Sequence, residues 1–520
     1  MYRILQALQD TYITNKIVNN SFRATDANVG QAGTLDFFKL YDESKLPGTS
    51  SNVIELSRTL IKFDLNPLRA LTGSVLDISH PSFKCQIKLI DIIGGQTVPS
   101  NFSLIAHPLS KSFDEGVGRD IISFNDLDKA NFLTASFSNG ANITWTSEGA
   151  SRDGLLGSNN LDIISSGNLN DGAGVVNLFR TQTFSVGSED LLVDVTPIIS
   201  ATLVNTIPDY GFRIAYSGAL ETDTQTLFVK RFSSRHSTQF RNRPKLIVRY
   251  NDSIRDDTNN FFFDITGSVF LNNYHRGNPA NIVEGLAATQ ATGLNSIKLK
   301  LQSGSFSKVI SGSQLAIGDN FITGIYSASF ALSSYDASVI SGTQTIKNFA
   351  DASGSITFDT VWASFANTST YPFLSSTLKV NTNPRNSFDN TPRRINMSVT
   401  NLRHGYKSNE VVRFRVFAAD VDNGPTFSKM PIIRPSVIFD SAFYRLLEKS
   451  SGDIIIPFDD DSSPGHGSAT KLSTDSQGMY FDMYMADLSI GKVYKVEFKV
   501  NDNGSAQIIE NAGVFFRVDA

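Results

Sequence analysis

Cysteine, tryptophan and charge are all scarce in this chain of 520 residues, which has 1 cysteine and 2 tryptophans. The single cysteine, Cys85, excludes an internal disulfide framework and a cysteine-based zinc cage. Charged residues make up 18% of the chain, against about 25% in an average soluble protein. The formal net charge is −4, so the chain lacks the electrostatic footprint of a nucleic-acid-binding protein, and we expect no nucleic-acid partner.

Long apolar runs are also missing. The sequence contains no stretch of about 18 consecutive apolar residues, so it offers no membrane span and we expect no membrane partner. The segment 1–15 carries one basic residue, Arg3, and no apolar core of signal-peptide length. We therefore expect the chain to fold in the cytoplasm of the cell that makes it.

Alternating apolar and polar residues recur from one end of the chain to the other. The pattern is clearest in Val493–Val500, where the apolar residues Tyr494, Val496, Phe498 and Val500 alternate with Lys495, Glu497 and Lys499. It recurs in Arg58–Leu65, Ile297–Leu301, Val412–Val416 and Met479–Met485. Such alternation predicts strands with one wet and one dry face, as in antiparallel sheets. The sequence therefore predicts an all-β protein built from tandem antiparallel β-sandwiches with a few short helices.

Helical signals are short, and polar stretches suggest the domain boundaries. Thr196–Asn205 has a capping Thr and a Pro at the first helical position, and Asp440–Lys449 has a capping Asp, so each predicts a short helix. The polar stretches 251–260 and 381–393 have almost nothing to bury and are interpreted as linkers. They divide the chain into 1–252, a β-rich middle part at 253–385, and 386–520, where strand spacing predicts an immunoglobulin-like sandwich.

Short motifs follow one another in a fixed order through the first part. They are Asp10–Ile13, Asn28–Gly30 with Leu35, Arg58–Leu65, Phe113–Gly116, Ile143–Trp145, Asp194–Thr196, Ser234–Arg235 and Pro244–Tyr250. In this order they resemble the DNRLRE-type β-sandwich family, which is related to carbohydrate-binding modules and is often attached to surface or extracellular proteins. The resemblance implies a jelly-roll-like sandwich for 1–252. Two positions depart from the family pattern: Phe113 replaces Trp, and His236 replaces Glu.

The chain as a whole also resembles structural proteins of tailed-bacteriophage virions. It is rich in Ser, Asn and Gly, has one cysteine and strings β-sandwiches together. Such proteins fold in the host cytoplasm, where disulfides do not persist, and end up outside cells. The resemblance implies a location in the tail, neck or baseplate, with other virion proteins and copies of the same chain as partners.

Motifs of catalysis and cofactor binding are missing from the sequence. It has no Gly-x-Ser-x-Gly elbow, no Walker-type phosphate loop and no histidine pair at helical metal-ligand spacing. We therefore expect no enzymatic activity, no cofactor and no metal. Cys85 lies on the apolar face of an alternating strand, which predicts a buried structural thiol.

The densest positive region lies near the end of the first part. Its candidate contact residues are Arg231, Arg235, His236, Arg241 and Arg243. One interpretation is a solvated or partner-facing surface, and the other is a site for an acidic glycan, with Trp145 as a stacking platform. A lone Trp in a sandwich is also typical of the core. The sequence thus favours a virion structural protein that acts by assembly, with recognition of an acidic surface polysaccharide, on a host surface for example, as the alternative.

Overall fold

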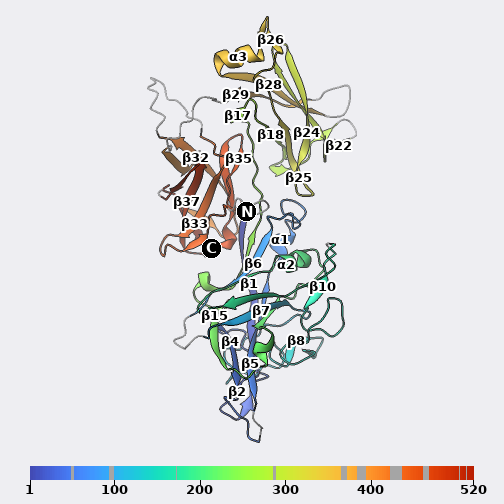
Figure 1. Cartoon of the computed structure of the whole chain (residues 1–520), viewed down its shortest axis with the longest axis vertical. Coiled ribbons are helices and arrows are strands. Elements are labelled where there is room, and N and C mark those ends of the chain that lie inside the picture. The colour runs from blue at the N-terminus through green and yellow to red at the C-terminus, as the bar shows by residue number, and fades with distance from the viewer. Residues whose placement is uncertain are drawn as a thin grey trace. The chain divides into compact units, whose positions relative to one another are not determined.

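The computed structural model confirms the all-β prediction (Figure 1). It describes residues 1–48, 52–92, 99–170, 172–284, 288–364, 372–382, 394–421, 436–460, 468–502, 504–510 and 512–520. Within these ranges the only α-helices are α1 (Asn66–Arg69), α2 (Thr196–Leu203) and α3 (Ile346–Ser353). None of these helices is long and apolar enough to cross a membrane.

The chain divides into two compact units. Residues 3–70 and 83–249 form what we call the N-terminal unit, and residues 1–2, 71–82 and 250–520 form the C-terminal unit. The sheets of the predicted middle and last parts both belong to the C-terminal unit. The boundary expected between 385 and 386 lies outside the described residues, so the division into 1–252, 253–385 and 386–520 stays a prediction.

A 10-stranded sheet organises the N-terminal unit in the order β12-β7-β14-β5-β1-β16-β6-β13, while β4 pairs with both β5 and β15. The strands are β1 (Tyr2–Thr14), β4 (Thr34–Tyr41), β5 (Ile54–Phe63), β6 (Lys84–Leu89), β7 (Phe102–Pro108), β12 (Arg180–Phe184), β13 (Leu191–Asp194), β14 (Phe212–Tyr216), β15 (Leu227–Ser233) and β16 (Lys245–Arg249). Short hairpins join them: β2 (Ile17–Val18) with β3 (Phe22–Arg23), β8 (Thr134–Ser138) with β9 (Ala141–Thr144), and β10 (Ser166–Asn168) with β11 (Val175–Asn177).

The central strand β5 of this unit is more deeply buried than its alternating sequence predicts. β5 lies between β1 and β14, and its neighbouring residues Leu60 and Ile61 are both fully buried. Arg58, expected on a wet face, is 7% exposed. The expectation of one wet face is therefore wrong for Arg58, because both faces of this central strand are covered there. Cys85 is fully buried on β6, as predicted.

A 7-stranded sheet forms the first part of the C-terminal unit, in the order β17-β29-β28-β23-β24-β25-β18. Its strands are β17 (Phe261–Phe262), β18 (Gly267–Asn272), β23 (Ile297–Ser303), β24 (Phe306–Ile317), β25 (Asn320–Phe330), β28 (Ser355–Ser364) and β29 (Pro372–Asn381). The short pairs beside it are β19 (Tyr274–His275) with β20 (Asn278–Pro279), β21 (Val283–Glu284) with β22 (Thr289–Gln290), and β26 (Val339–Ser341) with β27 (Gln344–Thr345).

Two further sheets pack face to face through aromatic rings. One has the order β30-β32-β36-β35, and the other has the order β31-β39-β37-β33-β34 with β38 beside β37. Their strands are β30 (Ile395–Val399), β31 (Gly405–Lys407), β32 (Val411–Asp420), β33 (Ala442–Glu448), β34 (Ile454–Ile456), β35 (Ser473–Asp475), β36 (Gly478–Tyr484), β37 (Val493–Asp502), β38 (Ser505–Ile509) and β39 (Phe515–Asp519). Phe481 of the first sheet stacks on Tyr444 of the second with 4.3 Å between ring centroids. Such stacked rings bury a large apolar area in a sandwich core.

One of the two predicted helices is wrong. The N-terminal one forms as α2, although Val195 rather than Thr196 is its N-cap residue. Asp440–Lys449 instead contains strand β33, which pairs with β37 from Ala442 opposite Val500 to Glu448 opposite Tyr494. Apolar residues occur on both faces of this segment, so its sequence fits a buried strand as well as a helix, and pairing with a neighbouring strand decided the outcome.

The stretch 251–260, which we call the connector, is not an unattached linker. Thr474 of β35 donates its backbone N–H to the carbonyl of Ile254 at 2.8 Å. The N–H of Asp257 bonds to the carbonyl of Ser268 on β18 at 2.8 Å. Asp256 and Asp257 are only 3% and 8% exposed. The prediction that this stretch has almost nothing to bury is therefore wrong, because its polar groups are hydrogen-bonded to the edges of two sheets.

Candidate functional site

The predicted basic cluster is largely paired with carboxylates from distant segments. Arg231 on β15 lies 3.1 Å from Asp36 on β4. Arg235 donates from Nε and Nη2 to both oxygens of Glu115, at 2.5 and 2.7 Å. A guanidinium that donates two hydrogen bonds to one carboxylate forms a neutral pair. Such a pair has little remaining attraction for an anionic ligand.

Asn28 explains why two of the early motifs lie together. Its side-chain amide donates to the carbonyl of Glu115 at 2.8 Å, and its amide oxygen accepts from the N–H groups of Gly30 and Gly118. Gly116 has φ +80°, and a Cβ there would lie 2.3 Å from the Asn28 oxygen. Only glycine fits so tight a turn without strain. Asn28 and this turn therefore position the Glu115 side chain.

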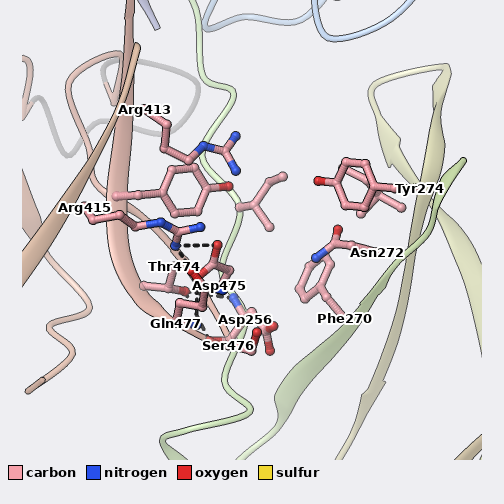
Figure 2. Close-up of a pocket in the computed structure, with 13 residues that line it drawn as sticks. Asp256, Phe270, Asn272, Tyr274, Arg413, Arg415, Thr474, Asp475, Ser476 and Gln477 are labelled. Atoms are coloured by element: carbon pink, nitrogen blue, oxygen red, sulfur yellow. Dashed lines mark hydrogen bonds and ion pairs between the residues drawn. The ribbon is translucent and has the colours of Figure 1, made fainter. Parts of the chain in front are cut away.

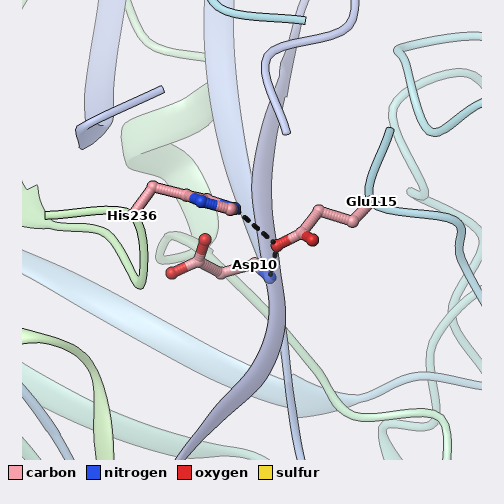
Figure 3. A group of neighbouring side chains, drawn as sticks. All are labelled: Asp10, Glu115 and His236. Atoms are coloured by element: carbon pink, nitrogen blue, oxygen red, sulfur yellow. Dashed lines mark hydrogen bonds and ion pairs between the residues drawn. The ribbon is translucent and has the colours of Figure 1, made fainter. Parts of the chain in front are cut away.

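Asp10, Glu115 and His236 converge from β1, the segment after β7 and the segment after β15 (Figure 3). Asp10 is 1% exposed, and its Oδ2 accepts from the backbone N–H of Arg235 at 2.6 Å. Its Oδ1 is buried without a hydrogen-bond partner among the described atoms. Burial raises the pKa of the Asp10 carboxyl to about 7, and the nearby Glu115 carboxylate adds to the rise. We call these three residues and Arg235 the Asp10 cluster.

A divalent cation is one chemical option for this cluster. The ligand atoms of Asp10, Glu115 and His236 all lie within 4.8 Å of one another, and carboxylate with imidazole suits Zn²⁺ or Mn²⁺. Glu115 Oε1, however, already accepts from Arg235 Nε and from the Asp10 N–H at 2.9 Å. A cation would compete with a guanidinium for the same oxygens. The contacts fit an ion-pair cluster that ties three segments together better than a metal centre.

The other candidate contact residues are buried or are held by neighbouring groups. Trp145 is 4% exposed, and its Nε1 donates to the carbonyl of Asn131 at 2.9 Å, so its indole is core and leaves no free face for a sugar. Arg243 lies over the ring of Phe240 at 5.4 Å and donates to the carbonyl of Ser237 at 3.0 Å. Arg241 lies in the same short 3₁₀ turn as Phe240. Arg243 lies near enough to Asp10 for its positive charge to lower the pKa of that carboxyl, whereas the indole of Trp145 is enclosed in the core.

A cavity of about 270 Å³ lies in the C-terminal unit (Figure 2). The residues that line it are Ile254, Asp256, Phe270, Asn272, Tyr274, Ile325, Arg413, Arg415, Thr474, Asp475, Ser476, Gln477 and Tyr480. They come from the connector, from β18, β19 and β25, and from β32, β35, β36 and the turn between β35 and β36. We call it the β35 pocket. Its lining combines aromatic rings, amides, two guanidinium groups and two carboxylates.

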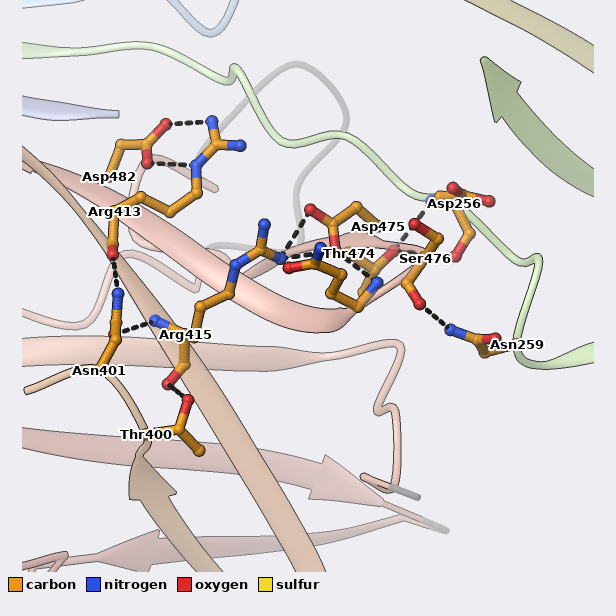
Figure 4. Close-up of polar contacts among 11 residues, drawn as sticks. Asp256, Asn259, Thr400, Asn401, Arg413, Arg415, Thr474, Asp475, Ser476 and Asp482 are labelled. Carbon is orange, nitrogen blue, oxygen red and sulfur yellow. Dashed lines mark hydrogen bonds and ion pairs between the residues drawn. The ribbon is translucent and has the colours of Figure 1, made fainter. Parts of the chain in front are cut away.

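Arg413 and Arg415 point to one side of the β35 pocket from alternate positions of β32 (Figure 4). Arg413 donates to both oxygens of Asp482 at 2.8 and 2.9 Å, and its guanidinium lies 4.0 Å from the ring centroid of Tyr480. Arg415 bonds to both oxygens of Asp475 at 2.6 Å. The two guanidinium groups are therefore fixed in place by carboxylates and by stacking on an aromatic ring.

The connector closes the floor of the β35 pocket. Thr474 Oγ1 accepts from the Asp256 N–H at 2.8 Å, and Asn259 donates to the carbonyl of Ser476 at 2.7 Å (Figure 4). Burial raises the pKa of the Asp256 carboxyl to about 6, partly offset by hydrogen bonds from Thr258. The hydrogen bonds from Thr258 fix the Asp256 carboxyl at the edge of the cavity, where little water reaches it.

Sequence reasoning missed the β35 pocket and two members of the Asp10 cluster. It singled out Arg235 and His236, but Asp10 and Glu115 appeared only as parts of motifs that carried a resemblance. The alternation in Val412–Val416 could have indicated two arginines on one face, and it was interpreted only as a wet strand face. Nothing in the sequence indicated that Tyr274 would lie beside them.

Comparisons with known proteins add little. No family model and no curated protein matches the chain. One similar solved structure is titled "Structures of Clostridium thermocellum CbhA fibronectin(III)-like modules". It is 8% identical, the match covers 51% of this chain and 90% of that chain, and the TM-score is 0.13. A likeness at this level carries no argument about fold, site or function.

Proposed function

We propose that the chain is a structural component of a tailed-phage virion, in the tail, neck or baseplate, and that it acts by assembly with other virion proteins and with copies of itself. On this proposal the sandwiches are rigid blocks, and their strand edges and loops bind neighbouring subunits. Many weak contacts then add up through high effective concentration in the particle.

The open edge of β29 is the observation that carries this proposal. β28 pairs with one side of β29 along its length, whereas on the other side β17 pairs only with Val380 and Asn381 within the described residues. The remaining edge, 372–379, has one charged residue, Lys379, and Leu374 is 46% exposed. An open edge with so little charge is a template for pairing with a strand of another subunit.

Buried ion pairs support the role of a rigid block. The fully buried Lys230 lies 2.5 Å from Asp91, and Arg58 bonds to both oxygens of Glu221. Each pair joins strands to segments more than a hundred residues away in sequence. Because these cations are paired inside the unit, they are not offered to a ligand, and loss of either partner would leave a buried charge unpaired.

Mass spectrometry of purified phage particles tests the location. We expect the polypeptide in intact virions at a stoichiometry that survives density-gradient purification. Its absence from particles that infect normally would refute the proposal.

Light scattering of the purified full chain tests the assembly mechanism. We expect self-association that weakens in Leu374→Lys, because a charge on an open edge opposes pairing. Val361→Lys is the control, since Val361 lies on β28 and is paired on both sides, with Lys300 of β23 and with Ser375 of β29. Equal association of both variants would refute a role for the β29 edge.

A further inference from the structure

We infer that the β35 pocket binds a neutral pyranose sugar, as one residue of a larger glycan. This site is separate from the basic cluster of the N-terminal unit and does not depend on a virion location.

Charge balance within the pocket argues for a neutral ligand. Its lining contains two arginines, Arg413 and Arg415, and two aspartates, Asp256 and Asp475. Each guanidinium is also paired with a carboxylate, Arg413 with Asp482 and Arg415 with Asp475. An acidic sugar would therefore find no uncompensated cation and would approach carboxylates.

The polar groups that line the pocket suit the neighbouring hydroxyl groups of a sugar. A hydroxyl both donates and accepts, and an Arg–Asp pair presents N–H donors beside a carboxylate acceptor. The amides of Asn272 and Gln477 in the same lining add groups that do both. Asp482 holds the guanidinium of Arg413, and Asp475 holds that of Arg415, so the donors are positioned in advance of binding.

Aromatic surface in the pocket supplies the contact for the apolar face of a sugar ring. Tyr274 is 58% exposed and faces the arginines across the cavity (Figure 2). The electron-rich face of an aromatic ring attracts the partly positive C–H groups of a pyranose. The volume of about 270 Å³ lies just below the range of about 300 to 1,000 Å³ typical of drug-sized ligands, which suits a single sugar residue.

A glycan array tests the inference with the full chain. The probes are oligosaccharides that end in neutral hexoses, beside matched ones that end in sialic or uronic acid. We expect binding only to neutral termini, with little change between about 0.05 and 0.5 M salt because no net charge is neutralised. Binding restricted to acidic termini, or no binding at all, would overturn the inference.

Variants localise the site. Tyr274→Ala should weaken binding by about tenfold or more, whereas the matched control Tyr335→Ala should not, since Tyr335 is 59% exposed but outside the pocket lining. Arg415→Lys keeps the charge but removes the planar fork, so it should also weaken binding. Wild-type binding by Tyr274→Ala or by Arg415→Lys would contradict this site.

Discussion

Replacing Asp10 with Asn should make the N-terminal unit more stable at alkaline pH. The Asp10 carboxyl releases its proton near 3.8 in its ordinary state and near 7 in the folded protein, where burial raises its pKa. Folding therefore takes up a proton between these values, so the free energy of unfolding falls as the pH rises through this window. At about 1.4 kcal/mol per pKa unit, the loss amounts to about 4 kcal/mol above pH 7.

The Asn variant avoids this loss because its amide is neutral at every pH. Its amide oxygen can still accept the Arg235 N–H that now bonds to Asp10 Oδ2 at 2.6 Å. We expect the variant to exceed the wild type in free energy of unfolding by up to about 4 kcal/mol near pH 8 and to equal it near pH 4. The difference should grow with pH between those limits.

The difference in free energy of unfolding can be measured by urea unfolding, followed by Trp145 fluorescence in a Trp362→Phe background. The chain has 2 tryptophans, so Trp145 then reports on the N-terminal unit alone. Asp120→Asn is the control, because hydrogen bonds from Ser123 and Ile122 hold the pKa of Asp120 below its usual value. Above about pH 5 Asp120 is ionised in the folded and the unfolded chain, so its replacement should leave the slope between about pH 5 and 8 unchanged. A wild-type stability that does not fall with rising pH would refute the reasoning.

Three further substitutions probe the same unit. Lys230→Met leaves the carboxylate of Asp91 buried without its cation, and should lower the free energy of unfolding by about 3–5 kcal/mol, while replacing both by apolar residues should restore most of it. Trp145→Ala removes a core indole and should cost about 3–5 kcal/mol in urea unfolding. Arg235→Ala should lower the thermal midpoint and leave migration in a polyanionic-glycan gel unchanged, because Arg235 is paired with Glu115; retardation that weakens in this variant would instead support recognition of an acidic glycan.

Strands with strict alternation were the most predictable part of the fold. Val493–Val500 falls inside β37, and Ile297–Leu301 inside β23. In both, the apolar face packs on a core. The expectation of a wet opposite face holds for the partly exposed lysines but is wrong for Glu497, which is 3% exposed and paired with Arg445 and Lys495. The same rule misled for Arg58 on β5, because a strand covered on both faces can bury a polar residue that has an ionic partner.

The candidate sites were less predictable, since their residues are distant in sequence. Asp10 and Glu115 lie 105 positions apart, and Asn28 at the Gly116 turn and Arg235 both hold Glu115 where the Asp10 N–H reaches it. A sequence lists carboxylates but does not state which of them share a site. The short motifs around Asp10 and Glu115 indicated a fold, and they also contained the residues that meet in it.

The connector shows why polar composition alone does not identify a linker. A polar segment can be solvated, or it can be buried if each donor and acceptor finds a partner, and both have the same hydropathy. Here Asp256 and Asp257 are buried because sheet edges at Thr474 and Ser268 supply partners that the connector itself lacks. Strand edges need such partners as much as the connector does, since their N–H and C=O groups are otherwise unpaired. The floor of the β35 pocket therefore forms because the connector and the strand edges supply hydrogen-bond partners to each other. One of these bonds, from Asp256 to Thr474, joins residues more than 200 positions apart in sequence.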